Sequence, residues 1–293
     1  MISVRHLNPI IGDVLASVLE AYKEHVIAIY GIGSFFDDSL PDDWTKNDLD
    51  LIVILDDLSI VPKKDWTDAR FDTFKRDGIE VFIGYNTLDA YKDKKTFQEQ
   101  SFANYEWALT DLKNPENSQL IYGKDVREHM PDIRSLTYDL KDLLIRALYH
   151  LDKSCAATKQ GENESAMSQF SKALFKFGFY LSVFKDPDFR STSIREISKK
   201  VQEIVKTSPK FKDNLLDLLK ESIKYRRTET FRDFERIRKR FTAALFSLLG
   251  KGVLHERMTY QKLREVLTAG FGDGRAFTFL VNILDALKKK HAP

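Results

Sequence analysis

Two apolar runs decide the fold of this chain: Val26-Ile-Ala-Ile-Tyr-Gly31-Ile-Gly33-Ser34 and, after a polar loop, Asp48-Leu-Asp50-Leu-Ile-Val-Ile-Leu55. Each run has the length and composition of a buried strand. Because side chains alternate across a strand, Asp48 and Asp50 point to the same face, about 7 Å apart. Ionised carboxylates are costly to bury unless they are paired or bind a metal. The alternative to a site for Mg²⁺, which prefers oxygen ligands, is a strand start with two solvated acids.

Two further features accompany the aspartates. Gly33 and Ser34 stand where the first strand should end and a helix begin, and glycine and helix-start N–H groups favour a bound phosphate. By itself such a glycine more often marks only a turn. A third strand pattern, Gly78-Ile-Glu80-Val-Phe-Ile-Gly84, places Glu80 between apolar residues. Alone, Glu80 would be an edge-strand charge; after the two aspartates it completes a set of three acids.

In this combination the chain resembles the nucleotidyltransferase superfamily related to DNA polymerase β. The pattern of that family is an apolar strand, Gly-Ser, a short loop, two acids flanking an apolar residue, and a third carboxylate on a later strand. The resemblance implies that Ser34 and the Gly33 backbone hold a triphosphate. It also implies that Asp48 and Asp50 bind two Mg²⁺ ions, with Glu80 as the third metal-site acid and candidate base.

The resemblance covers about the first 130 residues and extends to Gln119-Leu-Ile-Tyr-Gly-Lys-Asp125. This stretch is similar to the Leu-Tyr-Gly segment that closes the domain in aminoglycoside and minimal nucleotidyltransferases. The chain departs from the family where Phe35-Phe36-Asp37-Asp38 replaces an arginine and a small-residue turn, and where Asn47 replaces a common serine. The loop 35–47 carries four acids, which repel a triphosphate unless they face away or recruit metal.

The whole chain, at 293 residues, is long enough for two domains, and its 43% hydrophobic content is that of a soluble globular protein. No run has the length of a transmembrane helix, and the first 25 residues lack a signal-peptide layout, so we expect no membrane partner. The single cysteine, Cys155, forms no intrachain disulfide; we expect a buried thiol and a cytoplasmic protein. The net charge of +2 does not indicate nucleic-acid binding. The oligomeric state stays open, a homodimer included.

The expected first domain, residues 1–130, is an α+β nucleotidyltransferase domain with a short mixed sheet and flanking helices. Hydrophobic periodicity predicts helices and strands in alternation. The helices are predicted at 8–25, at 66–76 and, broken, at 87–109; the strands at 26–30, 49–55, 79–85 and 120–122.

After Pro131 the strand patterns disappear, and an all-α helical bundle is expected over residues 131–252, with a C-terminal helical extension over 253–293. Helical domains follow the catalytic domain in kanamycin nucleotidyltransferase and accompany minimal nucleotidyltransferases. The helices are predicted at 136–151, 164–184, 193–206, 211–224, 229–249, 259–269 and 275–290.

Three features of the bundle have competing interpretations. Arg146 and His150 are close to the Arg-x4-6-His spacing of ribonuclease toxins, although a partly buried polar pair is favoured. The basic stretch 224–240 is either a solvated helix face or a contact to triphosphate or RNA. The glycines of 270–274 lack the Lys-Ser/Thr of a P-loop and predict a turn between helices.

The expected function is that of a metal-dependent nucleotidyltransferase, which moves a nucleoside monophosphate from an NTP to an acceptor hydroxyl and releases pyrophosphate. The acceptor (small molecule, protein or RNA) and the preferred base stay open. One alternative is a catalytically inactive nucleotide-binding or protein-interaction module. Another is an RNA-directed nucleotidyltransferase that uses the basic stretch.

Overall fold

The structure, a computed structural model, describes residues 9–46, 48–64, 67–207, 215–228, 234, 236 and 237. The chain forms two compact units. The first comprises Met1–Thr137 together with Asp188–Glu196, and the second comprises Tyr138–Pro187 together with the chain from Ile197 onward. The first unit thus extends beyond the expected boundary at residue 130 and takes in a segment from within the predicted bundle. The expected extension 253–293 lies outside the described residues.

The first unit contains a five-stranded mixed sheet with the strand order β3-β4-β2-β1-β5. The central strand β2 runs parallel to β4, and the other neighbouring pairs are antiparallel. The strands are β1 (Val26–Ile32), β2 (Asp48–Leu55), β3 (Arg70–Arg76), β4 (Ile79–Thr87) and β5 (Ser118–Gly123). With the flanking helices, this sheet confirms the predicted α+β class.

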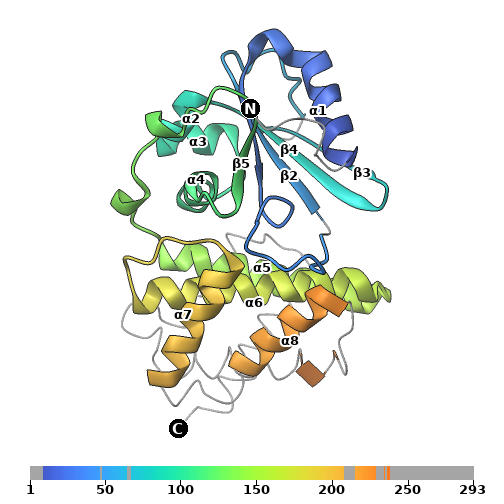
Figure 1. The fold of residues 1–293 in the computed structure, drawn as a ribbon, viewed down its shortest axis with the longest axis vertical. Helices are drawn as coiled ribbons and strands as arrows, with labels where there is room; N and C mark the ends of the chain where they lie inside the picture. The colour runs from blue at the N-terminus through green and yellow to red at the C-terminus, as the bar shows by residue number, and fades with distance from the viewer. Residues whose placement is uncertain are drawn as a thin grey trace. The chain divides into compact units, whose positions relative to one another are not determined.

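Helices cover both faces of the sheet (Figure 1). On one face α1 (Pro9–Tyr22) packs with alternate residues of β2 and β4 in one apolar cluster. On the other face α2 (Leu88–Lys92), α3 (Lys94–Gln100) and α4 (Tyr105–Lys113) form the second cluster. Short 3₁₀ turns occur at Lys23–His25, Arg127–His129 and Ile133–Ser135. β2 therefore lies inside the unit, with both faces covered along most of its length.

The helix predicted at 66–76 is wrong, because the chain forms strand β3 from Arg70 and pairs antiparallel with β4. The connection is Asp77-Gly78, and both residues have positive φ angles, 49° and 80°. An Asp-Gly pair with positive φ at both positions makes the tight turn whose twist suits a β-hairpin. The sequence therefore carried a hairpin signal, although the apolar residues before it also fit a helical spacing.

The second unit is helical in its described part, as predicted. Its helices are α5 (Leu140–Gln160), α6 (Asn163–Lys185), α8 (Leu215–Thr228) and all but the first three residues of α7 (Ile194–Thr207). A Cβ at Gly178 of α6 would come within 2.9 Å of Ile197, so this glycine allows α7 to approach closely. Cys155 is buried, as expected. The helices predicted at 259–269 and 275–290, and nearly all of the one at 229–249, fall outside the described residues.

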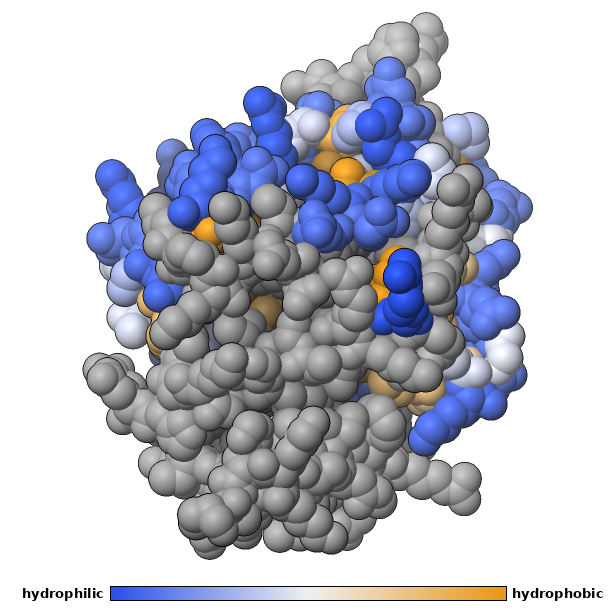
Figure 2. Space-filling view, turned by 90° about the horizontal axis from the view of Figure 1, so that it is seen from below, coloured by the Kyte–Doolittle hydropathy of each residue, from blue (hydrophilic) through white to orange (hydrophobic). Residues whose placement is uncertain are grey.

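In the part of the chain that the structure describes, no helix combines the length and the apolar character that a membrane crossing requires. On the face drawn in Figure 2, the described residues are mostly hydrophilic, and hydrophobic ones show only as small patches between them.

Candidate active site

The two aspartates open the central strand. Asp48 is the first residue of β2, and both Asp48 and Asp50 are partly buried, whereas Leu49 and Leu51 are fully buried on the α1 side. Because side chains alternate, the aspartates share their face with Ile52 and Ile54, which pack against α2–α4. The predicted common face of the two carboxylates is therefore present.

Glu80 lies beside the aspartates on the neighbouring strand. The parallel register pairs Asp48 with Glu80 and Asp50 with Phe82, so Glu80 points to the same face from about 4.8 Å away. Its side chain is exposed, and its carboxylate lies 4.0 Å from the Lys75 ammonium. Among the residues described here, no three His, Cys, Asp or Glu side chains gather closely enough to hold a metal ion. The structure thus provides a pair of aspartates with a flanking glutamate.

The Gly33–Ser34 turn adjoins Asp50 on the other side of β2. Ile32 of β1 pairs with Asp50, and a Cβ built on Gly33 would lie 3.6 Å from the Asp50 carboxylate. Gly33 has a φ of 77°, which favours glycine. Its N–H donates to the Asn117 carbonyl oxygen at 3.0 Å, so this amide is already used. A phosphate at this turn must rely on Ser34 and on the space that Gly33 leaves.

No helix begins after Ser34, contrary to the sequence-based expectation. The chain instead turns back, with the Phe36 N–H donating to the Gly33 carbonyl oxygen at 3.0 Å. The cause is the burial of Phe36, whose side chain packs directly over the backbone of Gly31. A helix starting at Ser34 would carry this aromatic ring away from the core, so the turn is favoured over the helix.

The Ser34 hydroxyl oxygen is buried and makes no hydrogen bond, and the same holds for Ser118 at the start of β5. Ser118 is placed close by, because it pairs with Ile32, the residue before the Gly33–Ser34 turn. A buried hydroxyl without a partner costs free energy, so natural proteins usually satisfy it, often with a ligand or water. Ser34 is therefore a candidate donor to a ligand oxygen, although its hydroxyl is enclosed by the protein in this conformation and would have to turn outward to reach one.

Two carboxylates of the acidic loop 35–47 accept hydrogen bonds from other residues of the chain. Asp37 is buried, accepts a hydrogen bond from the Ser39 N–H at 2.9 Å, and has a pKa raised chiefly by burial. Asp38 accepts a hydrogen bond from the Gln119 side-chain amide at 3.1 Å. These contacts hold both carboxylates in place within the turn region, so part of the acidity of this loop is engaged by the protein itself.

A polar network that the sequence did not predict supports the turn. The Asp111 carboxylate accepts hydrogen bonds of 2.7 Å from both the Asn117 amide and the Thr192 hydroxyl. Asn117 in turn supplies the carbonyl oxygen that fixes Gly33. Thr192 lies in the segment that returns to the first unit, 75 residues from Asn117. We therefore assign these side chains a positioning role.

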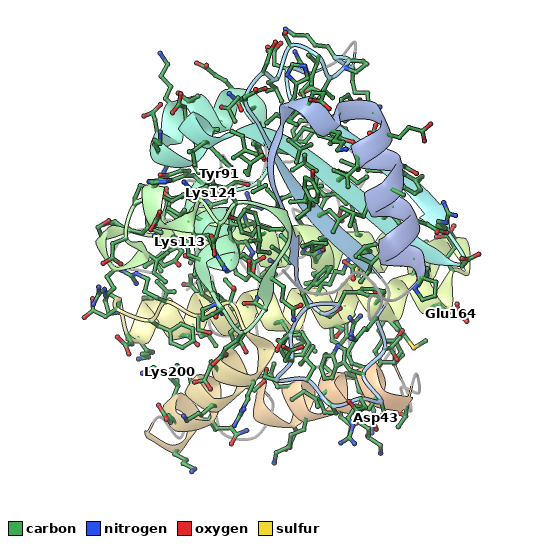
Figure 3. The ribbon with its side chains drawn as sticks, turned by 45° about the horizontal axis from the view of Figure 1, so that its top comes forward. Asp43, Tyr91, Lys113, Lys124, Glu164 and Lys200 are labelled. Carbon is green, nitrogen blue, oxygen red and sulfur yellow. The ribbon has the colours of Figure 1, made fainter. Side chains whose placement is uncertain are left out.

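The stretch Gln119–Asp125, which resembles the closing segment of the family's domain, includes most of β5 and contacts β1. The Tyr30 hydroxyl donates to Asp125 at 3.0 Å and accepts from the Val126 N–H at 2.7 Å. Arg127 pairs with Asp125 and stacks over the Tyr30 ring. The arginine lowers the pKa of Asp125 to about 2, and burial raises the pKa of Tyr30 to about 12. Nearby, Lys113 (labelled in Figure 3) donates to the carbonyl oxygens of residues 130 and 131.

In the second unit, His150 is partly buried, and its Nδ1 lies 2.9 Å from the Gln169 side-chain oxygen. Burial lowers its pKa to about 3, so the ring is neutral at physiological pH. The polar partner that the structure gives His150 is Gln169 on α6, and the pairing of His150 with Arg146 stays a prediction. On α8, Arg226 is buried, with 5% exposure, whereas Arg227 is exposed. Most of the basic stretch beyond them lies outside the described residues.

The sequence matches no protein-family model and no curated protein. Among solved structures, it matches a nucleotidyltransferase-like protein from Exiguobacterium sibiricum 255-15 with a TM-score of 0.32 and 13% identity. The match covers 95% of this chain and 90% of the other. So slight a likeness carries no argument about activity, which must be inferred from this chain's own residues.

Proposed function

We propose that this protein is a metal-dependent nucleotidyltransferase, which transfers a nucleoside monophosphate from an NTP to an acceptor hydroxyl and releases pyrophosphate. One observation carries the proposal. Asp48 and Asp50 share a face at the start of the central strand, directly beside a glycine turn that holds Ser34, whose buried hydroxyl has no hydrogen-bond partner within the protein. Carboxylates for a cation and a donor for phosphate oxygens thus meet at one end of the sheet.

The donor set fits Mg²⁺. This ion prefers oxygen ligands and is usually bound by one or two carboxylates, with substrate phosphates and waters completing its octahedral shell. Asp48 and Asp50 would supply the carboxylates of two such ions, with Glu80 as a third acid beside them. A ready cage of three acids is not required when the nucleotide brings its own oxygens. When bound, Mg²⁺ would neutralise phosphate charge and lower the pKa of the acceptor hydroxyl.

The chain's own residues would then mainly position charge. Ser34 would donate to an oxygen of the leaving phosphates, and the absence of a side chain at Gly33 leaves room for them next to Asp50. Glu80, exposed and on the same face, would accept the proton of the attacking hydroxyl. Transfer at phosphorus asks for alignment and electrostatic stabilisation more than for a covalent intermediate, which suits a site built from acids and a turn.

The test is Mg²⁺-dependent labelling by α-³²P-NTPs against pools of RNA, protein and small molecules, with slow hydrolysis of the NTP to NMP as a second readout. Asp50→Asn should reduce turnover by at least about 100-fold, because the bound cation supplies much of the transition-state stabilisation. Asp77→Asn is the matched control. It makes the same substitution at the β3–β4 hairpin, where the backbone has φ 49° and asparagine is well accepted.

Thermal melting separates the outcomes. Mg²⁺ with an NTP should raise the melting temperature of the wild type and of Asp77→Asn, since a ligand that binds only the folded state stabilises it. If the NTP binds but neither labelling nor hydrolysis occurs, the protein is the inactive module. If none of the four NTPs shifts the melting temperature at millimolar concentration, with Mg²⁺ or Mn²⁺, the nucleotidyltransferase proposal is wrong.

A further inference from the structure

Three phenylalanine side chains form a cluster on the first unit: Phe71 on β3, Phe82 on β4 and Phe102 in the connection between α3 and α4. The Phe71 and Phe82 rings stack with centroids 6.0 Å apart, and the Phe71 and Phe102 rings meet edge to face at 5.3 Å. Phe82 and Phe102 are nevertheless 36% and 52% exposed. Exposed contiguous aromatic surface of this kind commonly marks a binding surface.

The cluster belongs to the same face as the acids. Phe82 pairs with Asp50 in the parallel register, so both side chains leave the sheet on the same side from adjacent strands, about 4.8 Å apart. The Phe82 ring leans over Gly84, where an added Cβ would meet it at 3.3 Å. A larger residue at position 84 would push the ring out of this position. The aromatic surface is thus packed in place beside Asp50.

The in-line geometry of the proposed transfer indicates which of the two substrates would lie next to this cluster. The Gly33–Ser34 turn lies on the β1 side of Asp50, and Glu80 and Phe82 lie on the β4 side. In phosphoryl-type transfer, the attacking and leaving oxygens are roughly in line. If the leaving phosphates lie toward Ser34, the attacking hydroxyl must enter from the β4 side, next to the phenylalanines.

We propose, on the basis of the function above, that the phenylalanine cluster binds an aromatic ring of a small-molecule acceptor whose hydroxyl is modified. The acceptor oxygen attacks the α-phosphorus, and the bond from that phosphorus to the α,β-bridging oxygen breaks. Pyrophosphate leaves with the electron pair, and the hydroxyl proton passes to Glu80 and then to water. An aromatic ring suits the stacked and edge-to-face arrangement of the three phenyl rings.

The test compares benzyl alcohol with cyclohexylmethanol, which has a similar size and hydroxyl position but no aromatic face. Binding is measured on the full-length protein by saturation-transfer NMR without metal, and transfer is measured with α-³²P-ATP and Mg²⁺. Wild type should bind and label benzyl alcohol in preference, and Phe82→Leu should reduce that preference by roughly 2- to 10-fold.

Phe74→Leu is the matched control. Phe74 is a 41% exposed phenylalanine on the same hairpin, but it pairs with Val81 and so points to the opposite face. This variant should keep the wild-type preference. No binding of either alcohol, an equal preference in wild type and Phe82→Leu, or an equal loss in Phe74→Leu would overturn the inference.

Measurements of NTP binding and hydrolysis distinguish a failure of the acceptor inference from a failure of the proposed function. Phe82→Leu should leave the melting shift by Mg²⁺ and NTP unchanged; if it weakens NTP binding instead, the cluster stacks the nucleobase and the acceptor proposal is wrong. If NTP is bound and hydrolysed without any aromatic preference, only the acceptor inference fails. If NTP is neither bound nor hydrolysed, the proposed function fails and the acceptor inference falls with it.

Discussion

Gly31→Ala should destabilise the protein and distort the candidate phosphate turn. A Cβ at position 31 would come within 2.1 to 2.4 Å of three atoms of the Phe36 ring, where contacts between carbon atoms normally lie near 3.5–4.0 Å. Phe36 is 2% exposed, so its ring has no free volume into which to move. Because the Phe36 N–H closes the turn on Gly33, displacement of Phe36 should also disturb Ser34.

Overpacking of this kind costs about 1–3 kcal/mol. For a protein of this size, that corresponds to a fall in melting temperature of roughly 2–12 °C. Thermal and urea unfolding would measure the loss of stability. The rise in melting temperature on addition of Mg²⁺ and NTP would show whether the Gly33–Ser34 turn still binds the nucleotide. Gly12→Ala on α1 is the matched control, because the added Cβ would meet no atom within 4 Å apart from those of its chain neighbours and its own helix backbone. It should be neutral or stabilise by about 0.4–1 kcal/mol.

A double-mutant cycle with Phe36→Ala tests the cause. Removal of the ring alone should cost about 3–5 kcal/mol, but it makes room for the methyl group. Gly31→Ala should therefore cost less in the Phe36→Ala background than in the wild type, by about 1–3 kcal/mol. Strictly additive effects, or a Gly31→Ala protein that melts like the wild type, would refute the packing of Phe36 on Gly31.

Three further predictions concern other parts of the chain. Ser34→Ala should weaken NTP binding by about 10- to 100-fold, in a binding titration, without lowering stability, since the buried hydroxyl has no protein partner to lose. Gly123→Ala should cost more stability than Gly31→Ala, because φ is 83° and the Cβ would lie 2.1 Å from the Ile27 carbonyl oxygen; equal melting temperatures would contradict this. Because burial lowers the pKa of His150 to about 3, only the unfolded chain takes up this proton between pH 6.5 and 3. Stability should therefore fall by about 1.4 kcal/mol per pH unit through this group as the pH drops in that window, and His150→Gln should remove that part of the slope in urea titrations.

The sequence by itself determined the features that depend on local periodicity. The alternation in β2 predicted that Asp48 and Asp50 share a face, and the apolar spacing predicted the bounds of α6 and α7 closely, whereas α5 runs nine residues beyond its predicted end at 151. These predictions succeed because side-chain direction follows directly from backbone geometry, with a period of two in strands and 3.6 in helices. The α+β class and the helical second part follow from the same patterns.

The tertiary structure decided the features that depend on contacts between distant segments. The chain after Ser34 is a turn because Phe36 packs on Gly31, and that turn is fixed by a carbonyl oxygen from Asn117. Strand β3 forms by pairing with β4, although its short segment also fits a helix. The phenylalanine cluster joins two strands and a helical connection. Local propensities differ by about 1 kcal/mol or less per residue, so burial and strand pairing override them, and neither can be read from a short stretch of sequence.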